Sequence, residues 1–428
     1  MIYDDRETLA REEITQLQSE RLQKTVVHAA KNVPSYREAF ETAGIEPERI
    51  ESIEEITQLP LTTKDDLRAT YPDGMFAVSE EKIRRIHASS GTTGKPKIVA
   101  YTKADLDLWS EVMARSLAAS GVSPGNTVQN AYGYGLFTGG LGVHYGVERL
   151  GATIIPIGGG QTQRQIELLR DLESDVLTCT PSYALYLAES ARKNGIDPRE
   201  FALSTVIIGA EPCTQPMREA IESALDVSAV DIYGLSEIIG PGVSNECHEA
   251  QDGLHIWEDH FYPEVIDPGT GEPLPEGEEG ELILTSLTKE ALPIIRYRTG
   301  DLTALHYDEC VCGRTMVRME NVTGRADDLL IVRGVNVYPS QIESVVLEFD
   351  GVAPHYRIDL EREGELDTIA ITVELDTEFT DSHEDLESRI HERLQNVLTL
   401  SPDALTLVEQ GAIERTEVGK VKRVYDHR

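Results

Sequence analysis

The sequence is short of basic side chains, and this shortage excludes several classes of protein. Its 428 residues carry 39 Lys and Arg against 75 Asp and Glu, which gives a formal net charge of -36. General affinity for nucleic acid or for an anionic membrane requires a basic surface, so both are excluded. Because a Debye length of roughly 3 Å at about 1 M salt screens such self-repulsion, we expect a halophilic protein from a high-salt cytoplasm. An ordinary acidic protein is the open alternative.

Long hydrophobic runs and a secretory leader are also missing. Residues 1–12 are acidic and polar, whereas a signal peptide has a basic start and an apolar core. No run of about 18 apolar residues occurs, the length that a membrane helix needs. Cysteine is scarce: five residues without a leader argue against a disulfide framework and leave thiols or metal ligands to be explained. We expect a soluble, cytoplasmic protein.

The sequence does contain a regular alternation of strand-like and helix-like segments. These segments follow one another at 153–157, 162–172, 176–179, 182–194, 205–209 and 215–225. Such alternation predicts βαβ units and a largely parallel sheet. Residues 8–43 have apolar positions at helical spacing, and the region after 250 is rich in turns and β segments. The predicted fold class is α/β, with a large N-terminal domain of parallel-type sheets, a β-rich subdomain and a small α+β cap at the C-terminus.

One segment, Ser89–Lys97, combines hydroxyls, glycines and lysines in nine residues. Glycines let backbone N–H groups turn inward, hydroxyls add donors, and two lysines supply positive charge, as a phosphate-binding loop requires. The glycine spacing is not that of a Walker A loop. Residues 98–101 are typical of a short strand, so the loop is expected to join two strands of a hairpin; a polar hairpin turn is the alternative. The residues expected to bind phosphate are Ser89, Ser90, Gly91, Thr92, Thr93, Gly94 and Lys95.

With four further motifs, this loop resembles the adenylate-forming enzymes, and among them the phenylacetate–coenzyme A ligases. The other motifs are Asp-Ile-Tyr-Gly-Leu-Ser-Glu at 231–237, Arg-Tyr-Arg-Thr-Gly-Asp-Leu at 296–302, Gly-Arg-Ala-Asp-Asp at 324–328 running to 333–336, and Gly-Lys-Val-Lys-Arg at 419–423. The resemblance implies a ligase that uses ATP and Mg²⁺ to activate an aryl acid, most directly phenylacetate, as an acyl-adenylate. Transfer to coenzyme A would then give aryl-CoA, AMP and pyrophosphate, a step of aromatic acid catabolism.

The resemblance implies three catalytic residues. Glu237 would bind magnesium, which favours carboxylates and phosphate oxygens. Lys420 would bridge the substrate carboxylate and the α-phosphate; a solvated basic tail is the alternative. The family usually has a proline shortly before this lysine, and here 414–418 stands instead. Asp327 would be the hinge of a mobile cap, which divides the chain into an adenylation domain, 1–326, and a cap domain, 327–428.

Further ATP-binding residues are implied around adenine and ribose. Tyr233 would lie against adenine beside the small residues of Gly209-Ala210-Glu211. Asp301 would accept hydrogen bonds from both ribose hydroxyls, since a carboxylate has two acceptor oxygens. Arg325 would assist at ribose or phosphate. The alternatives are a core tyrosine at 233 and a turn residue at 301.

The acyl pocket is expected in the segment 132–140, where aromatic residues alternate with glycines. Tyr132, Tyr134 and Phe137 suit a flat apolar slot for an aryl ring, and Pro241 would close its floor. A tightly turned buried loop is the alternative.

A structural zinc site is expected from Cys247, His255, Cys310 and Cys312. Zinc accepts a Cys₃His set as a closed tetrahedral site. Unligated cysteines with a surface histidine are the alternative. His248 competes with His255 as the fourth ligand, but adjacent side chains at 247 and 248 point apart in an extended segment.

Two other functions stay open at the level of sequence. A relative of the deazaflavin-modifying synthetases would adenylylate a different substrate, and a nucleotide-binding regulator would catalyse nothing. The intact set of Glu237, Asp301 and Lys420 argues against the regulator. The expected partners are the aryl acid, ATP and coenzyme A, without nucleic acid or membrane, and a homodimer is one open form of assembly.

Overall fold

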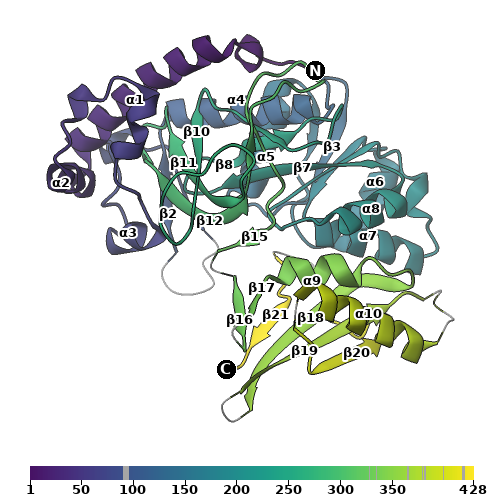
Figure 1. The fold of residues 1–428 in the computed structure, drawn as a ribbon. Helices are drawn as coiled ribbons and strands as arrows, with labels where there is room; N and C mark the ends of the chain where they lie inside the picture. Colours follow the sequence, from purple (N-terminus) through teal and green to yellow (C-terminus); the bar gives the residue numbers. More distant parts are fainter. Residues whose placement is uncertain are drawn as a thin grey trace.

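The computed structural model describes residues 1–89, 96–326, 328–333, 335–363, 366–377, 379, 382–398, 400–416 and 420–428. Figure 1 shows a larger lobe, formed by the chain up to strand β15 (Gly324–Arg325), and a smaller lobe formed by the C-terminal part. We call the larger lobe, up to residue 326, the body, and the smaller one, from residue 328, the cap.

The body is built around a sheet of nine strands in the order β13-β14-β9-β8-β7-β6-β5-β3-β4. Its parallel part consists of β3 (Thr127–Asn130), β4 (Thr153–Ile155), β5 (Val176–Cys179), β6 (Thr205–Gly209) and β7 (Ser228–Leu235). Its antiparallel part consists of β8 (Gly240–Glu246), β9 (Leu254–Ile256), β13 (Leu305–His306) and β14 (Arg318–Met319). The predicted parallel sheet is confirmed. Part of the β-rich region extends it instead of forming a sheet of its own.

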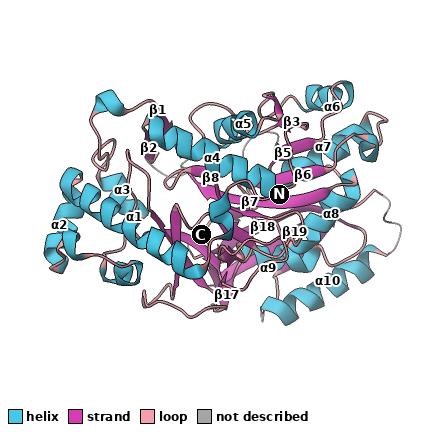
Figure 2. Cartoon of the chain, turned by 90° about the horizontal axis from the view of Figure 1, so that it is seen from above, coloured by secondary structure: helices cyan, strands magenta, loops and turns pink. Residues whose placement is uncertain are grey.

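Helices cover both faces of this sheet because successive strand residues point to opposite sides. Val176 and Ile207 belong to the core that includes α4 and α5, whereas Leu177 and Val206 belong to a second core with the other three helices. The helices are α4 (Lys103–Ala119), α5 (Gly139–Leu150), α6 (Thr162–Asp171), α7 (Pro181–Lys193) and α8 (Gln215–Leu225). In Figure 2 the helices of the body lie around its strands.

The rest of the β-rich region forms a second, antiparallel sheet in the order β10-β11-β12-β15. Its other strands are β10 (Phe261–Ile266), β11 (Gly280–Ser286) and β12 (Tyr297–Thr303). Leu22 and Val26 of the first helix pack in the same core as Leu282 and Leu284 of β11. This sheet carries the Tyr-Arg-Thr-Gly-Asp motif.

The helical N-terminus consists of two helices that meet at Pro34. The helices are α1 (Arg11–Asn32) and α2 (Pro34–Ala43), and α3 (Lys64–Ala69) follows. Proline has no N–H and its ring clashes with the carbonyl four residues earlier, so the first helix stops before it. Short 3₁₀ helices occupy Asp5–Thr8, Pro47–Arg49, Ile53–Gln58, Glu80–Lys82 and Pro198–Glu200.

Strands β1 (Arg85–Ala88) and β2 (Ile98–Tyr101) form the antiparallel hairpin that was expected around the phosphate loop. The Ser89 amide donates to the Lys97 carbonyl at 3.0 Å, and the Lys97 amide donates to the Ser89 hydroxyl at 3.1 Å. These two bonds close the base of the loop.

The cap is an α+β unit, as predicted. It contains β16 (Leu330–Val332), β17 (Val335–Val337), α9 (Pro339–Val346), β18 (Val352–Glu363), β19 (Leu366–Leu375), α10 (His383–Leu398), β20 (Ala404–Val408) and β21 (Val424–Asp426). A sheet in the order β20-β19-β18-β21 packs in its own core with α9 and α10. None of the helices in the described parts of the chain is long and apolar enough to cross a membrane.

Candidate active site

The candidate nucleotide site begins at the carboxyl ends of β6 and β7. Gly209, the last residue of β6, pairs with Ile232 of β7, next to Tyr233. A Cβ at Gly209 would lie 2.4 Å from the Ile232 backbone oxygen, so no side chain fits there. Ala210 follows with a φ of 68°. Ligands of open α/β sheets bind at this edge, and the structure brings the two expected adenine-binding segments together on it.

Tyr233, Asp301 and Arg325 form one hydrogen-bonded group. The Tyr233 hydroxyl donates to Asp301 Oδ2 at 2.6 Å, and Arg325 Nη1 donates to Oδ1 at 2.5 Å. Burial, followed by the charge of Asp301, raises the pKa of Tyr233 well above its usual value, so this hydroxyl stays a donor. Strand pairing places Asp301 opposite Arg325. Both oxygens of the carboxylate are thereby oriented.

Glu237 is a buried carboxylate that stays charged. Its side chain forms an ion pair with Lys97, and the Tyr297 hydroxyl donates to its Oε1 at 2.9 Å. Burial raises the pKa of Glu237, but the charge and hydrogen bond of Lys97, together with a backbone hydrogen bond and the Tyr297 hydroxyl, lower it by more, so the pKa lies below its ordinary value. Glu237 is only 4% exposed, so it is not a surface glutamate.

The sequence did not predict that three further side chains lie around Glu237. Lys97 and Tyr297 lie inside quoted motifs, and their position there was the available signal. Lys289 had no such signal. Its ammonium donates to the Glu237 carbonyl at 3.1 Å and lies 4.7 Å from the centre of the Tyr101 ring. Burial lowers the pKa of Lys289 to about 8.

The segment that carries Lys420 lies against the same edge of the body. Lys420 itself is exposed. The amide of Val421 donates to Glu211 Oε1 at 2.7 Å, and the Ser182 hydroxyl donates to Glu211 Oε2 at 2.6 Å. Glu211, the last residue of the 209–211 turn, therefore bonds both to the segment of the cap that carries Lys420 and to the start of α7.

A second set of contacts joins cap and body nearby. Arg415 of the cap lies 3.2 Å from Glu189 of α7, and within the cap it also pairs with the buried Glu374. The Thr214 hydroxyl of the body donates to Glu343 of α9 at 2.9 Å. A cavity of about 300 Å³ lies beside these contacts, lined by both parts of the chain.

The expected acyl-pocket residues are partly or fully buried. The Tyr132 hydroxyl donates to the Cys179 carbonyl at 2.6 Å, and Asn130 donates to the Tyr134 hydroxyl at 2.9 Å. Phe137 lies over Gly139, where a Cβ would come within 2.6 Å of its ring. Pro241 accepts a hydrogen bond from the Trp109 indole at 3.1 Å. Both tyrosines have bonded hydroxyls and thus offer ring surface to a neighbour.

Two expected features lie outside the described residues. They are the tip of the phosphate loop, Ser90, Gly91, Thr92, Thr93, Gly94 and Lys95, and the hinge residue Asp327. Ser89 and Arg325 are described: Ser89 lies at the base of the hairpin, and Arg325 lies beside Asp301.

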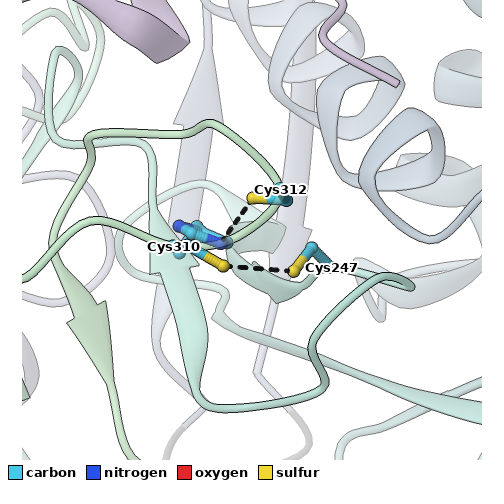
Figure 3. A group of neighbouring side chains, drawn as sticks. Cys247, Cys310 and Cys312 are labelled. Carbon is cyan, nitrogen blue, oxygen red and sulfur yellow. Dashed lines mark hydrogen bonds between the residues drawn. The ribbon is translucent and has the colours of Figure 1, made fainter.

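The four expected zinc ligands come together away from Glu237. One ligand atom from each of Cys247, His255, Cys310 and Cys312 lies within 4.8 Å of the others. Figure 3 shows the sulfurs of Cys247 and Cys310 facing each other. The structure selects His255 rather than His248, whose ring lies beside Gly121.

Comparison of the sequence with models of known protein families shows which class of enzyme the chain belongs to. The profile of the AMP-binding enzyme matches residues 3–287, and the profile of the AMP-binding enzyme C-terminal domain matches residues 334–428. The chain is thus an adenylate-forming, AMP-binding enzyme.

Sequence identity to curated proteins shows the family within this class. The chain is 50% identical over 443 residues to the phenylacetate–coenzyme A ligase of Thermus thermophilus, covering 100% of both chains. It is 50% identical over 430 residues to the phenylacetate–coenzyme A ligase of Escherichia coli, covering 99% of this chain and 97% of the relative. The chain belongs to the phenylacetate–coenzyme A ligase family.

Solved structures of 2-hydroxyisobutyryl-CoA ligase resemble the chain in one arrangement more than in another. The postadenylation state with 2-HIB-AMP matches with a TM-score of 0.93 at 31% identity, covering 99% of this chain and 91% of that one. The thioesterification state with 2-HIB-AMP and CoA matches with a TM-score of 0.73 at 31% identity, covering 98% and 91%. Cap and body of this chain are thus arranged as in the postadenylation state.

Proposed function

We propose that this enzyme joins phenylacetate to coenzyme A through a phenylacetyl-adenylate. A carboxylate oxygen of the acid attacks the α-phosphorus of ATP, and the bond to pyrophosphate breaks. The thiol of coenzyme A then attacks the acyl carbon, loses its proton and displaces AMP. The observation that carries the proposal is the placement of charged Glu237, the Tyr233–Asp301–Arg325 group and the lysine segment of the cap at one edge of the sheet.

The protein's part in the first step is positioning and charge. Two anions must meet, so aligned contacts and positive charge lower the barrier. Asp301 holds the ribose, while Tyr233 and the 209–211 turn bind adenine. Lys420 neutralises charge between the carboxylate and the α-phosphate. Ser89–Lys95 holds the leaving phosphates.

Magnesium fits the donor set at Glu237, a charged carboxylate at the base of the phosphate loop. When bound, Mg²⁺ neutralises charge on the phosphates. Lys97 now pairs with that carboxylate, so ATP loading has to loosen this ion pair. Tyr297 keeps Glu237 oriented through its hydroxyl.

The aryl ring of the acid is proposed to lie against Tyr132, Tyr134, Phe137 and Pro241. Buried ring surface with the hydroxyls already bonded favours a flat apolar group over a polar one. The same reasoning disfavours a bulky, polar deazaflavin cofactor.

Residues 1–326 and 327–428 are proposed to move as two units about Asp327. The separate cores of body and cap support this division, as do the two arrangements of the structural relative. Rotation carries Lys420 away after adenylation and frees the acyl carbon for the thiol.

The reaction is proposed to take place in the cytoplasm of a cell with a high internal salt concentration. The formal net charge of -36 supports a high internal salt concentration. Five free cysteines are consistent with a reducing compartment.

Pyrophosphate release tests the function directly. The purified enzyme, in high KCl with ATP and Mg²⁺, is given phenylacetate, benzoate, 2-hydroxyisobutyrate or a deazaflavin substrate. We expect the highest kcat/KM with phenylacetate and formation of its coenzyme A thioester. Release with the deazaflavin substrate alone would support the alternative synthetase, and no release with any of them would favour the regulator.

A further inference from the structure

We propose that Cys247, His255, Cys310 and Cys312 bind one Zn²⁺ ion that anchors the N-terminal segment to the body. Cys247 follows β8, His255 lies on β9, and the two other cysteines lie in the turn between β13 and β14. The site therefore joins three pieces of the antiparallel part of the nine-stranded sheet. It goes beyond the ligase reaction, because none of the four residues contacts the group around Glu237.

The spacing of the ligand atoms is that of a tetrahedral zinc site. With Zn–S bonds of about 2.3 Å and Zn–N bonds of about 2.1 Å, two sulfurs lie about 3.8 Å apart and a sulfur and a nitrogen about 3.6 Å apart. The Cys247 and Cys310 sulfurs are 3.7 Å apart, and Cys312 Sγ lies 3.4 Å from His255 Nε2. All five cysteines of the chain are free thiols here. Figure 3 shows Cys247, from the segment after β8, facing Cys310 and Cys312 of the turn between β13 and β14.

The chemistry of the donors favours zinc over other ions. Thiolates and imidazole are soft or borderline ligands, whereas Mg²⁺ and Ca²⁺ prefer oxygen. Cys247, His255 and Cys310 are buried and Cys312 is half-buried. Four protein ligands fill a tetrahedron and leave no position for a substrate, so the ion has a structural role.

The turn that carries two of the ligands also holds the start of the chain. Its backbone is closed by a bond from the Gly313 amide to the Cys310 carbonyl at 2.9 Å. Arg314, fully buried, pairs with Glu7 at 2.9 Å and donates to the Met1 carbonyl at 2.6 Å. Thr315 adds a backbone bond to Glu7 at 3.1 Å. An ion that fixes this turn therefore also fixes residues 1–9.

Metal analysis of protein purified without a histidine tag tests the site. We expect about one zinc per chain by plasma mass spectrometry. Cys312→Ser should lower the zinc content at least tenfold, whereas Cys213→Ser, a buried cysteine outside the set, should leave it unchanged. Less than a tenth of an equivalent of zinc in the unsubstituted protein, another metal in its place, or a Cys247–Cys310 disulfide in a denaturing thiol count would each overturn the proposal.

The anchoring role has its own measurement, which needs no substitution. Removing zinc with a chelator should make the bonds after Arg6 and Arg11 at least tenfold more sensitive to trypsin, and added zinc should restore protection. Equal cleavage with and without zinc would contradict the anchoring role even if zinc is bound. Cleavage elsewhere in the body at the same rate would instead indicate general unfolding and would also contradict it.

Discussion

At the scale of single residues, the proposed active site requires that the buried carboxylate of Glu237 stay charged. Burial opposes the charge on Glu237, and Lys97 restores it. Glu237, Tyr233 and Asp301 were predicted because each stands in a motif that resembles those of the adenylate-forming enzymes. The sequence did not predict the ion pair of Lys97 with Glu237 or the hydrogen bond from Lys289 to the Glu237 carbonyl. These contacts join residues 140 and 52 positions apart.

Lys97→Met should shift the pH dependence of adenylation. Without Lys97, burial dominates and the pKa of Glu237 rises, so the carboxylate becomes protonated at higher pH. The acid limb of kcat/KM for ATP should therefore move up by about one pH unit or more. Lys103→Met, which removes an exposed lysine paired with Asp107, is the control. An acid limb at the same pH in both variants would show that Lys97 does not set this pKa.

Lys420→Ala should separate the two half-reactions. Positive charge at the α-phosphate is needed while pyrophosphate leaves, so adenylation should slow by about 100-fold or more, mainly in kcat. Thioester formation from preformed phenylacetyl-adenylate should stay within about twofold of normal. Lys422→Ala, whose ammonium lies 4.5 Å from the Tyr425 ring centre, is the matched control. Equal losses in both half-reactions would refute the role of Lys420.

At the scale of helices and strands, periodicity and turn chemistry predicted most elements. The break between α1 and α2 falls at Pro34, and α8 has the predicted bounds, 215–225. The sequence could not predict which sheet each strand of the β-rich region joins. Strands β9 and β14 have only three and two residues, too few to show a hydrophobic pattern. They belong to the nine-stranded sheet because β9 pairs with β8 and β14 pairs with β9.

The contact between α7 and the cap should favour adenylation. Glu189→Gln removes the charge that Arg415 contacts across the boundary, and Glu374 still holds Arg415 inside the cap. A partly buried pair of this kind is worth about 1 kcal/mol, so adenylation should slow about fivefold. Thioester formation from preformed adenylate should not slow, because that step needs the other arrangement.

Lys193 supplies the control for this prediction. It pairs with Glu189 at 2.8 Å within α7, so Lys193→Met changes the charge beside Glu189 and leaves the contact with Arg415. This variant should keep both half-reactions. If Glu189→Gln and Lys193→Met behave alike, the Glu189–Arg415 pair does not hold the cap.

At the scale of the whole molecule, composition showed an acidic chain, and the alternation of strand-like and helix-like segments predicted an α/β fold, which the structure confirms. The placement of the cap against the body was not predictable. It depends on contacts such as Arg415 with Glu189 and Val421 with Glu211, which join residues 226 and 210 positions apart. No local pattern encodes contacts of that range.

The net charge of -36 should make stability depend on salt. Self-repulsion disfavours the compact state, and salt screens it. The melting temperature should rise by about 10 °C or more between 0.1 M and 3 M KCl. The measurement is a thermal melt followed by circular dichroism. A melting temperature that is unchanged or falls with KCl would exclude the halophilic interpretation.

The central claim is that the acid passes through an acyl-adenylate at this site. Phenylacetate labelled with ¹⁸O in both carboxylate oxygens tests it most directly, with ATP, Mg²⁺ and coenzyme A present. Attack of the carboxylate on the α-phosphorus leaves one labelled oxygen on the phosphate when AMP departs. Mass spectrometry should therefore find one ¹⁸O in AMP for each thioester formed. Unlabelled AMP, or ADP and phosphate as products, would contradict the account.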